Sequence, residues 1–275
     1  MPPTCETPSC TDGVDACQTA ILPHSQPQPF SAAFPARYPA HGLFSWLPSR
    51  CAACRHWPSH GLCANCYALF LRRTSCCIRC AIPMPATAQQ ICGQCLTHPF
   101  AFDATIAAVP YTDSWRQLVQ RFKFHQGTEY ARVIAQLMQM TIAQHLNDNR
   151  PDLIVPIAAA PSRMRERGYN QAWEIARPLA KLLQLPCASN VLIRTHEHDS
   201  QTHRKRKERF KALRHAFTAS PRWQGHLAEK HIALVDDVMT TGATLDAAAR
   251  ALKAAGAGQV SAWVFARTPE QRNQR

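Results

Sequence analysis

Four pairs of cysteines are the densest group of reactive side chains in this sequence, and two residues separate the members of each pair. The pairs are Cys51/Cys54, Cys63/Cys66, Cys77/Cys80 and Cys92/Cys95. Two thiolates at this spacing can bind one tetrahedral Zn²⁺, and a second pair completes a four-sulfur shell. A closed shell leaves no open coordination position, so the pattern predicts zinc with a structural role.

The order of the pairs favours two zinc sites, each formed by two consecutive pairs. One site uses Cys51, Cys54, Cys63 and Cys66, and the other uses Cys77, Cys80, Cys92 and Cys95. Interleaved pairing, replacement of Cys77 by the extra thiol of Cys76, and disulfides or free thiols in place of metal are the alternatives. Nine of the 13 cysteines lie between Cys51 and Cys95. This clustering favours metal in a reducing cytoplasm over a secreted disulfide framework.

The segment from Val235 to Thr244 is the second place where residue types and order indicate chemistry. An apolar run enters Asp236 and Asp237, and Thr240-Thr241-Gly242-Ala243-Thr244 then opens an Ala/Leu-rich helix. A strand–loop–helix junction presents unpaired N–H groups and the positive helix end to an anion. The two carboxylates suit ribose hydroxyls or a metal-bound ligand. A helix-capping turn that binds nothing is the alternative.

These residues need a framework, and the apolar pattern predicts one of alternating strands and helices. Strands are expected at 102–111, 153–157, 191–194, 232–235 and 260–266. Helices are expected at 113–124, 130–146, 171–185 and 243–255. Several of the strands are apolar throughout, which is typical of a mostly parallel sheet with helices on both faces. The fold class is therefore α/β and Rossmann-like.

Composition divides the chain into three parts. Residues 1–45 are rich in Pro, Ser, Thr, Ala and Gln and are expected to be a disordered extension. Residues 46–98 form the cysteine-rich zinc-binding module, and residues 99–270 form the α/β domain. No run approaches the roughly 18 to 20 apolar residues of a membrane-spanning helix, and the N-terminus lacks the pattern of a secretory signal. We therefore expect a cytoplasmic protein without an integral membrane segment.

The charge balance favours a polyanionic partner. The formal net charge is +13, from 31 basic and 18 acidic residues. The densest basic runs are 163–167 and 203–211, and the second could bind nucleic acid, close over a ligand or remain solvated. Trp115, Phe122 and Phe124 alternate with basic residues, as base-stacking side chains do. Helical spacing nevertheless favours a core position for Trp115 and Phe122.

The Asp236–Thr244 segment resembles the phosphoribosyl pyrophosphate signature of type I phosphoribosyltransferases. Over residues 44–268 the chain resembles the ComF family more closely. The matching segments are the paired cysteines, 99–103, Lys123-Phe124-His125, Val155-Pro156, 165–171, Ala216-Phe217, 235–244 and 266–269. The resemblance implies a type I phosphoribosyltransferase domain behind a double zinc-ribbon module. It also implies a role in natural transformation and DNA uptake, with single-stranded DNA as a partner. A further hypothesis makes the zinc module a docking surface for another uptake protein, such as a DNA-uptake helicase.

The resemblance also assigns roles by position. Asp236 and Asp237 would be the catalytic pair and bind the ribose hydroxyls. The 5′-phosphate would be bound by Val238, Met239, Thr240, Thr241, Gly242, Ala243 and Thr244. Pyrophosphate would meet a loop carrying Arg163, Arg165 and Arg167, and Mg²⁺ would be chelated mainly by the ligand's own oxygens.

Two departures from the family pattern fall around the expected pyrophosphate site. Ala158-Ala159-Ala160-Pro161 stands where family members usually have Pro-Leu-His-Pro, and Gln201-Thr202-His203-Arg204 stands where Gln-x-Gly-Leu is common. The favoured interpretation is therefore a DNA-binding transformation protein with a phosphoribosyl pyrophosphate-type pocket. The alternative is an active phosphoribosyltransferase that transfers phosphoribosyl to an unknown acceptor and releases pyrophosphate.

Overall fold

The computed structural model describes residues 49–59, 61–72, 74–85, 90–124, 128–146, 149–195 and 216–269. All of them belong to one compact unit, Arg37–Arg275. The predicted extension at 1–45 and the basic run at 203–211 lie outside the described residues.

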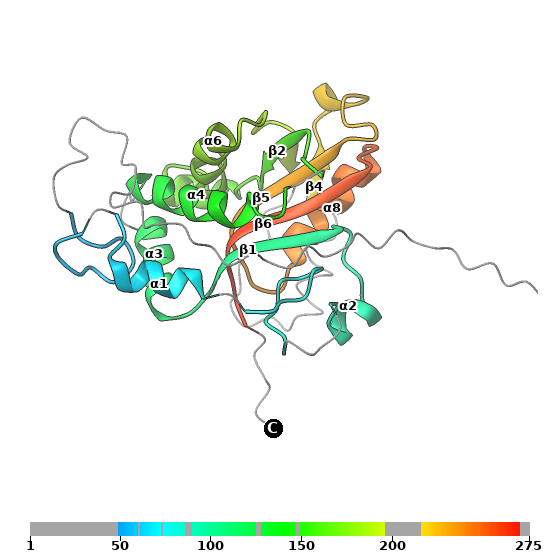
Figure 1. The fold of residues 1–275 in the computed structure, drawn as a ribbon. Helices are drawn as coiled ribbons and strands as arrows, with labels where there is room; N and C mark the ends of the chain where they lie inside the picture. The colour runs from blue at the N-terminus through cyan, green and yellow to red at the C-terminus, as the bar shows by residue number, and fades with distance from the viewer. Residues whose placement is uncertain are drawn as a thin grey trace, which may run out of the picture. The chain divides into compact units, whose positions relative to one another are not determined.

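A parallel sheet of four strands forms the centre of the described fold (Figure 1). Its order is β1 (Ala104–Pro110), β6 (Gln259–Arg267), β5 (His231–Met239) and β2 (Leu153–Pro156). The strands align with Val235 opposite Trp263 and Val155 opposite Leu234. Central strands of this kind are apolar throughout because both faces are covered. The predicted α/β class with a parallel sheet is confirmed.

Helices cover both faces of this sheet. Helices α3 (Asp113–Phe124), α4 (Thr128–Ile142) and α6 (Gln171–Leu183) pack on one face, and α8 (Ala243–Ala254) packs on the other. Alternate strand residues point to opposite faces, so Trp263 and Phe265 face the first group while Val264 faces α8. Trp115 of α3 meets Phe265 edge to face at 6.2 Å. The predicted core position of Trp115 is confirmed.

Three elements differ from the sequence-based expectation. Strand β3 (Leu192–Arg194) pairs antiparallel with β4 (Phe217–Ala219) in a separate two-stranded sheet. Strand β5 continues past Val235 to Met239, because β6 runs beside it as far as Arg267 and supplies hydrogen-bonding partners. The expected arginine loop instead forms helix α5 (Pro161–Arg167), whose residues are almost all exposed and therefore show no apolar periodicity.

The cysteine-rich segment contributes two short helices, α1 (Ala64–Leu71) and α2 (Gly93–Thr97). Phe70 of α1 packs against Trp115 with ring centroids 6.4 Å apart, which joins the first part of this segment to the α3 face. Cys77, Cys80 and Cys95 belong to the core on the α8 face. A single-turn 3₁₀ helix, η1 (Pro221–Trp223), follows β4. None of the described helices combines the length and apolarity needed to cross a membrane.

Candidate functional site

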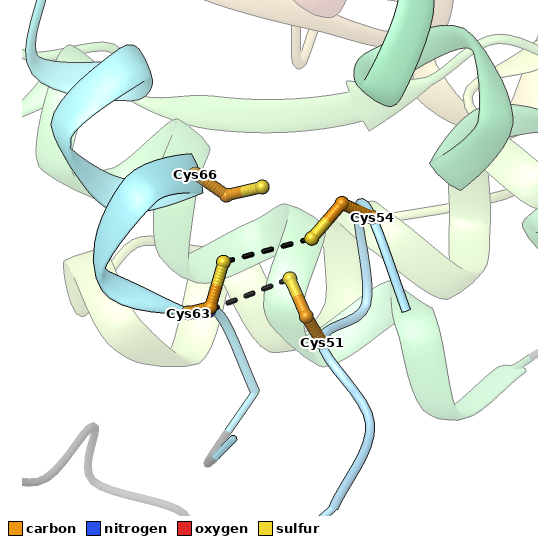
Figure 2. A group of neighbouring side chains, drawn as sticks. All are labelled: Cys51, Cys54, Cys63 and Cys66. Atoms are coloured by element: carbon orange, nitrogen blue, oxygen red, sulfur yellow. Dashed lines mark hydrogen bonds between the residues drawn. The ribbon is translucent and has the colours of Figure 1, made fainter. Parts of the chain in front are cut away.

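Eight cysteines form two groups of four in the described residues. Cluster 1 is Cys51, Cys54, Cys63 and Cys66, and cluster 2 is Cys77, Cys80, Cys92 and Cys95. Within each cluster the sulfur atoms all lie within 4.8 Å of one another. Figure 2 shows the four side chains of cluster 1 converging from a turn and from the start of α1. The sequential grouping predicted from the sequence is the one found. Cys76 belongs to neither cluster, and its thiol donates to the carbonyl of Thr74 at 3.3 Å.

The two clusters have the same local construction. In the first pair of each, the carbonyl of the leading cysteine accepts a hydrogen bond from the residue four positions later, Arg55 or Ala81, at 2.9 and 2.8 Å. Both of these residues adopt left-handed backbone angles, with φ of 70° and 54°. The second pair of each cluster begins a helix, with Cys63 and Cys92 at the N-caps of α1 and α2. In each cluster, therefore, a tight turn supplies two sulfur atoms and the start of a helix supplies the other two.

The distances and donors of both clusters fit zinc. The Cys54 and Cys63 sulfurs are 3.6 Å apart, as are those of Cys80 and Cys92. This is close to the edge of about 3.8 Å expected for a tetrahedron with Zn–S bonds of about 2.3 Å. The backbone N–H of Cys63 donates to the Cys51 sulfur at 3.4 Å. Both clusters can therefore hold zinc in a closed, structural shell.

Hydrogen bonding favours thiolate character at the leading cysteine of each cluster. Burial acts to raise the pKa of Cys51, but backbone N–H groups that donate to its sulfur lower the pKa to about 7. Cys77 shows the same balance between burial and N–H donors, and its pKa is also lowered to about 7. Burial and the neighbouring thiols raise the pKa of Cys66 and of Cys95. Metal binding requires thiolates, and N–H donors of this kind stabilise them.

The carboxylates of Asp236 and Asp237 lie near the carboxyl end of β5. Asp237 is 7% exposed, and its Oδ2 is 2.9 Å from the Nζ of Lys123 on α3. The backbone N–H of Asp237 donates to Oδ1 of Asp236 at 2.9 Å. Burial, and next the charge of Asp237, raise the pKa of Asp236 to about 7, while Lys123 and Arg163 act in the opposite direction. Ionisation of Asp236 beside Asp237 is therefore unfavourable in the free protein. A ligand that offers a hydroxyl donor or a cationic group would stabilise the ionised pair.

The loop between β5 and α8 is shaped by Gly242. Its φ of 82° is left-handed, and a Cβ added there would lie 2.7 Å from the Met239 Cε and 2.8 Å from the Phe100 Cε1. The carboxylate of Asp246, in the first turn of α8, accepts from the backbone N–H of Ala101 at 2.7 Å. Residues 100–101 therefore pack behind the loop and fix its backbone at the positive end of α8.

Arg267, the last residue of β6, supports the same loop from within the protein. Its side chain is 4% exposed. The Nε donates to the carbonyl of Cys80 at 2.7 Å, and Nη1 donates to the carbonyls of Met239, at 3.1 Å, and Thr240. One buried guanidinium therefore links cluster 2 to the loop.

The arginines expected at the pyrophosphate side lie on helix α5. Arg163 is close enough to Asp236 to lower its pKa, and the Arg167 guanidinium lies over the Phe124 ring, 5.2 Å from its centroid. Arg165 points to the opposite side of the helix, because residues two apart are about half a turn from each other. Phe124 is 61% exposed, whereas Phe122 is fully buried, as the helical spacing predicts.

Comparison with known proteins identifies the family. Residues 123–275 match the family model of the phosphoribosyl transferase domain. DNA utilization protein YhgH of Salmonella typhimurium is 30% identical over 231 residues, which cover 81% of this chain and 98% of that protein. Competence protein F of Haemophilus influenzae is 29% identical over 82% of this chain and its own full length. The chain belongs to the ComF family.

Other ComF-family and phosphoribosyltransferase proteins are also similar. Competence protein ComFC of Bacillus subtilis is 32% identical over 159 residues, which cover 58% of this chain and 62% of that protein. Among solved structures, the purine phosphoribosyltransferase of Pyrococcus horikoshii is 17% identical with a TM-score of 0.31, and the match covers 49% of this chain and 83% of that one.

Sequence reasoning considered Lys123 only as one of the basic residues that alternate with aromatic side chains, as candidate phosphate contacts, and it assigned no role to Arg267. Both stand in segments that carry the ComF resemblance, 123–125 and 266–269. That signal singles out the segments, but the partners of both residues lie far away in the sequence. Only the folded sheet brings Lys123 to Asp237 and Arg267 to Met239.

Proposed function

We propose that this ComF-family protein acts in DNA uptake and binds phosphoribosyl pyrophosphate, or a related ribose phosphate, at the end of β5. The observation that carries the proposal is the order of groups in space. The two carboxylates of Asp236 and Asp237 precede a loop that ends at Gly242. The left-handed backbone of Gly242 lets the chain turn into the 12-residue helix α8. Free N–H groups and a positive helix end are the usual features of a phosphate site.

In the proposed complex the ligand spans the acid pair and the loop. Asp236 and Asp237 accept hydrogen bonds from the ribose hydroxyls, and the loop from Thr240 to Thr244 donates N–H and hydroxyl groups to the 5′-phosphate. Arg163 and Arg167, which share one face of α5, supply most of the positive charge for pyrophosphate, and Arg165 adds charge from the opposite face of the helix. Mg²⁺ is chelated mainly by the ligand's own oxygens. Because Lys123 already pairs with Asp237, the ligand shares that carboxylate with an internal cation.

Thermal unfolding tests this assignment directly. Phosphoribosyl pyrophosphate with Mg²⁺ is expected to raise the Tm of the wild-type protein, because a ligand that binds only the folded state stabilises it. Asp236→Asn and Asp237→Asn should reduce that rise. Asp103→Asn should leave it intact, because Asp103 precedes β1 and pairs with Lys253 in the last turn of α8, at the other end of that helix from the loop. Ribose 5-phosphate and pyrophosphate, tested separately, report on the two halves of the site. No rise with any of these three ligands would refute the pocket.

We further propose that the protein binds single-stranded DNA. The relatives are named for competence and DNA utilization, and the net charge of +13 favours a polyanion. The exposed Phe124 ring beneath Arg167 supplies an aromatic surface with an adjacent cation. Bases of any sequence stack on such surfaces, at about 1–3 kcal/mol per base.

Fluorescence anisotropy with labelled oligonucleotides tests the DNA proposal. The logarithm of the affinity should fall by about 0.7 per neutralised phosphate for each log unit of salt. Phe124→Ala should weaken binding about tenfold, which corresponds to the lower part of the stacking range. Leu182→Ala, at another exposed apolar side chain that is 42% accessible, is the matched control. The proposal fails if the wild-type protein does not bind at low salt.

An active phosphoribosyltransferase is the second candidate, and the acid pair followed by a Gly-containing loop favours it. A nucleophile would displace pyrophosphate at the anomeric carbon, with the arginines and Mg²⁺ stabilising the leaving group. Release of pyrophosphate in the presence of candidate acceptors tests the activity. If Asp236→Ala released pyrophosphate as fast as the wild-type protein, the acid pair would have no catalytic role.

The remaining parts of the proposal concern organisation and partners. We propose two structural zinc ions per chain and a three-part division at residues 45 and 98. We also propose a cytoplasmic location and contact with a DNA-uptake helicase through the cysteine-rich module. Co-purification of such a helicase with the full chain, and its loss after mutation of the exposed Leu69 and Leu71 of α1 to Ser, tests the helicase contact.

A further inference from the structure

Arg267 occupies a buried position between cluster 2 and the β5–α8 loop. It donates hydrogen bonds to four backbone carbonyls, those of Cys80, Met239, Thr240 and Thr268. A guanidinium presents its donors in a fixed planar fork, so a shift of one carbonyl changes the geometry available to the others. A change in the position of the Cys80 carbonyl would therefore move the Arg267 guanidinium, and with it the hydrogen bonds to Met239 and Thr240 in the loop.

The Cys80 carbonyl is itself positioned by the metal-binding turn. Its sulfur is one of the four in cluster 2, and Ala81, directly after it, adopts a left-handed φ of 54°. Such a conformation is unfavourable for a non-glycine residue and persists only where surrounding contacts enforce it. Four metal–sulfur bonds would enforce it, and loss of the metal would free the turn.

A second contact joins the same two regions through apolar packing. Cys77 and Cys80 share a core with Phe100 and Met239, the two side chains that lie against Gly242. Phe100 stacks on Phe102 with ring centroids 4.6 Å apart, and Arg79 of the turn donates to the Phe102 carbonyl at 3.3 Å. The loop thus rests on cluster 2 both by hydrogen bonds and by packing, and Arg267 is the direct link.

We infer that Arg267 is a positioning residue that makes the shape of loop 239–244 depend on metal in cluster 2. Zinc in cluster 2 then favours the loop conformation that binds phosphate. The ligand part of this inference rests on the proposed function. Because coupling between two sites is reciprocal, a bound ribose phosphate must strengthen zinc binding in cluster 2 by the same factor as zinc strengthens ligand binding.

Hydrogen exchange of the full chain tests the inference without any ligand. In the wild-type protein, stepwise removal of zinc by a chelator should speed exchange of the amides at 240–244 when cluster 2 empties. Arg267→Lys keeps the positive charge but loses the fork, so its loop amides should exchange fast even with two zinc ions bound. Arg150→Lys is the matched control, because Arg150 also donates to a backbone carbonyl, that of Leu183 at 2.8 Å. Leu183 belongs to the core on the other face of the sheet from cluster 2.

Equilibrium zinc affinity then tests the reciprocal effect. In competition with a chelator, phosphoribosyl pyrophosphate with Mg²⁺ should raise the zinc affinity of cluster 2 in the wild-type protein by 5-fold or more, about the lower limit of typical coupling. The increase should disappear in Arg267→Lys and persist in Arg150→Lys. Cys54→Ser, which disables cluster 1, identifies the zinc ion that belongs to cluster 2.

The outcomes separate this inference from the proposed function. If loop exchange is the same with and without zinc, or the same in Arg267→Lys and wild-type proteins, the inference is overturned whatever the ligand does. If loop exchange follows zinc but no ribose phosphate raises the Tm, the positioning role stands and the proposed ligand is wrong.

Discussion

Lys123 and Asp237 form a 2.9 Å ion pair that joins α3 to the carboxyl end of β5. Two residues earlier on α3, Arg121 donates to the carbonyls of Ala52 and Ala53 at 2.8 and 2.9 Å, within the turn of cluster 1. Helix α3 therefore contacts the turn of cluster 1 through Arg121 and the acid pair through Lys123. Cluster 2 contacts the neighbouring loop through Arg267. Each metal-binding turn is thus joined to the candidate ligand site by its own side-chain contacts, through α3 for cluster 1 and through Arg267 for cluster 2.

The first prediction concerns the ion pair itself. Lys123→Met leaves the carboxylate of Asp237, whose side chain is only 11% exposed, without its cation. We expect a loss of about 2 kcal/mol in the free energy of unfolding, because an unpaired buried charge is costly. Urea denaturation measures it. Lys123→Met combined with Asp237→Asn should recover most of the loss, and a fully additive double mutant would show that the pair does not interact.

The second prediction concerns pH. Burial and the charge of Asp237 raise the pKa of Asp236 from 3.8 to about 7, against the opposing effects of Lys123 and Arg163. Since the folded-state pKa lies above the unfolded-state value, the contribution of this carboxyl is full below the unfolded pKa and is lost as pH rises towards 7.

Asp236→Asn should therefore raise the free energy of unfolding by about 4 kcal/mol near pH 8, since each unit of pKa shift corresponds to about 1.4 kcal/mol, and change it little near pH 4. Urea denaturation at both pH values provides the measurement. An equal effect of the substitution at the two pH values would contradict a raised pKa at this position.

The third prediction concerns zinc stoichiometry. Metal analysis of the purified full chain should find two zinc ions, one for each cluster. Cys77→Ser should reduce the content to one, because three sulfurs remain in cluster 2. Cys76→Ser should leave two, since the Cys76 thiol contacts Thr74 instead of a cluster. Retention of two zinc ions in Cys77→Ser and loss of one in Cys76→Ser would reverse the assignment.

The fourth prediction concerns Gly242. An alanine there must adopt a φ of 82° and place its Cβ 2.8 Å from the Phe100 ring. We expect Gly242→Ala to lose about 2–3 kcal/mol of stability and most of its stabilisation by ribose phosphate. Gly225→Ala is matched, because Gly225 has a φ of 77° but no atom within 4 Å of the added Cβ. Its smaller loss, about 1 kcal/mol, measures the backbone strain alone. Equal losses at the two positions would argue against close packing of Phe100 on the loop.

Local patterns predicted the elements that bury a continuous apolar face. The bounds of α3, Asp113–Phe124, agree with the predicted helix because Trp115, Leu118 and Phe122 repeat at helical spacing and are buried. Helix α5 has no buried residue, so it lacks the apolar periodicity on which the prediction relied. Its helix signals are local ones, with Pro161 at its start and Gly168 in the left-handed conformation at its end. The pairing of β3 with β4 was not predicted, because two three-residue strands from distant segments leave little periodic signal.

The candidate site was predicted only in its local parts. The cysteine pairs and the order Asp236-Asp237…Thr-Gly are short-range patterns. Because a tetrahedral metal needs four ligands, the spacing of the cysteines was enough to predict which four share a site. The supports of the loop are long-range contacts. The Arg267 side chain donates to Cys80, 187 residues away in the sequence, and the backbone N–H of Ala101 donates to Asp246, 145 residues away. Such partners depend on strand order, which a single sequence does not specify.

The strand order also bears on the sequence of events during synthesis. In the order β1-β6-β5-β2, the last strand of the described chain is an interior strand. Until β6 leaves the ribosome, β1 has no neighbour in the sheet and the Cys80 carbonyl has no guanidinium to accept from. The cysteine turns are made long before that, and an unpaired strand edge invites wrong pairing. Zinc binding early in synthesis would keep the eight thiols from oxidation until β6 is made and the sheet can form.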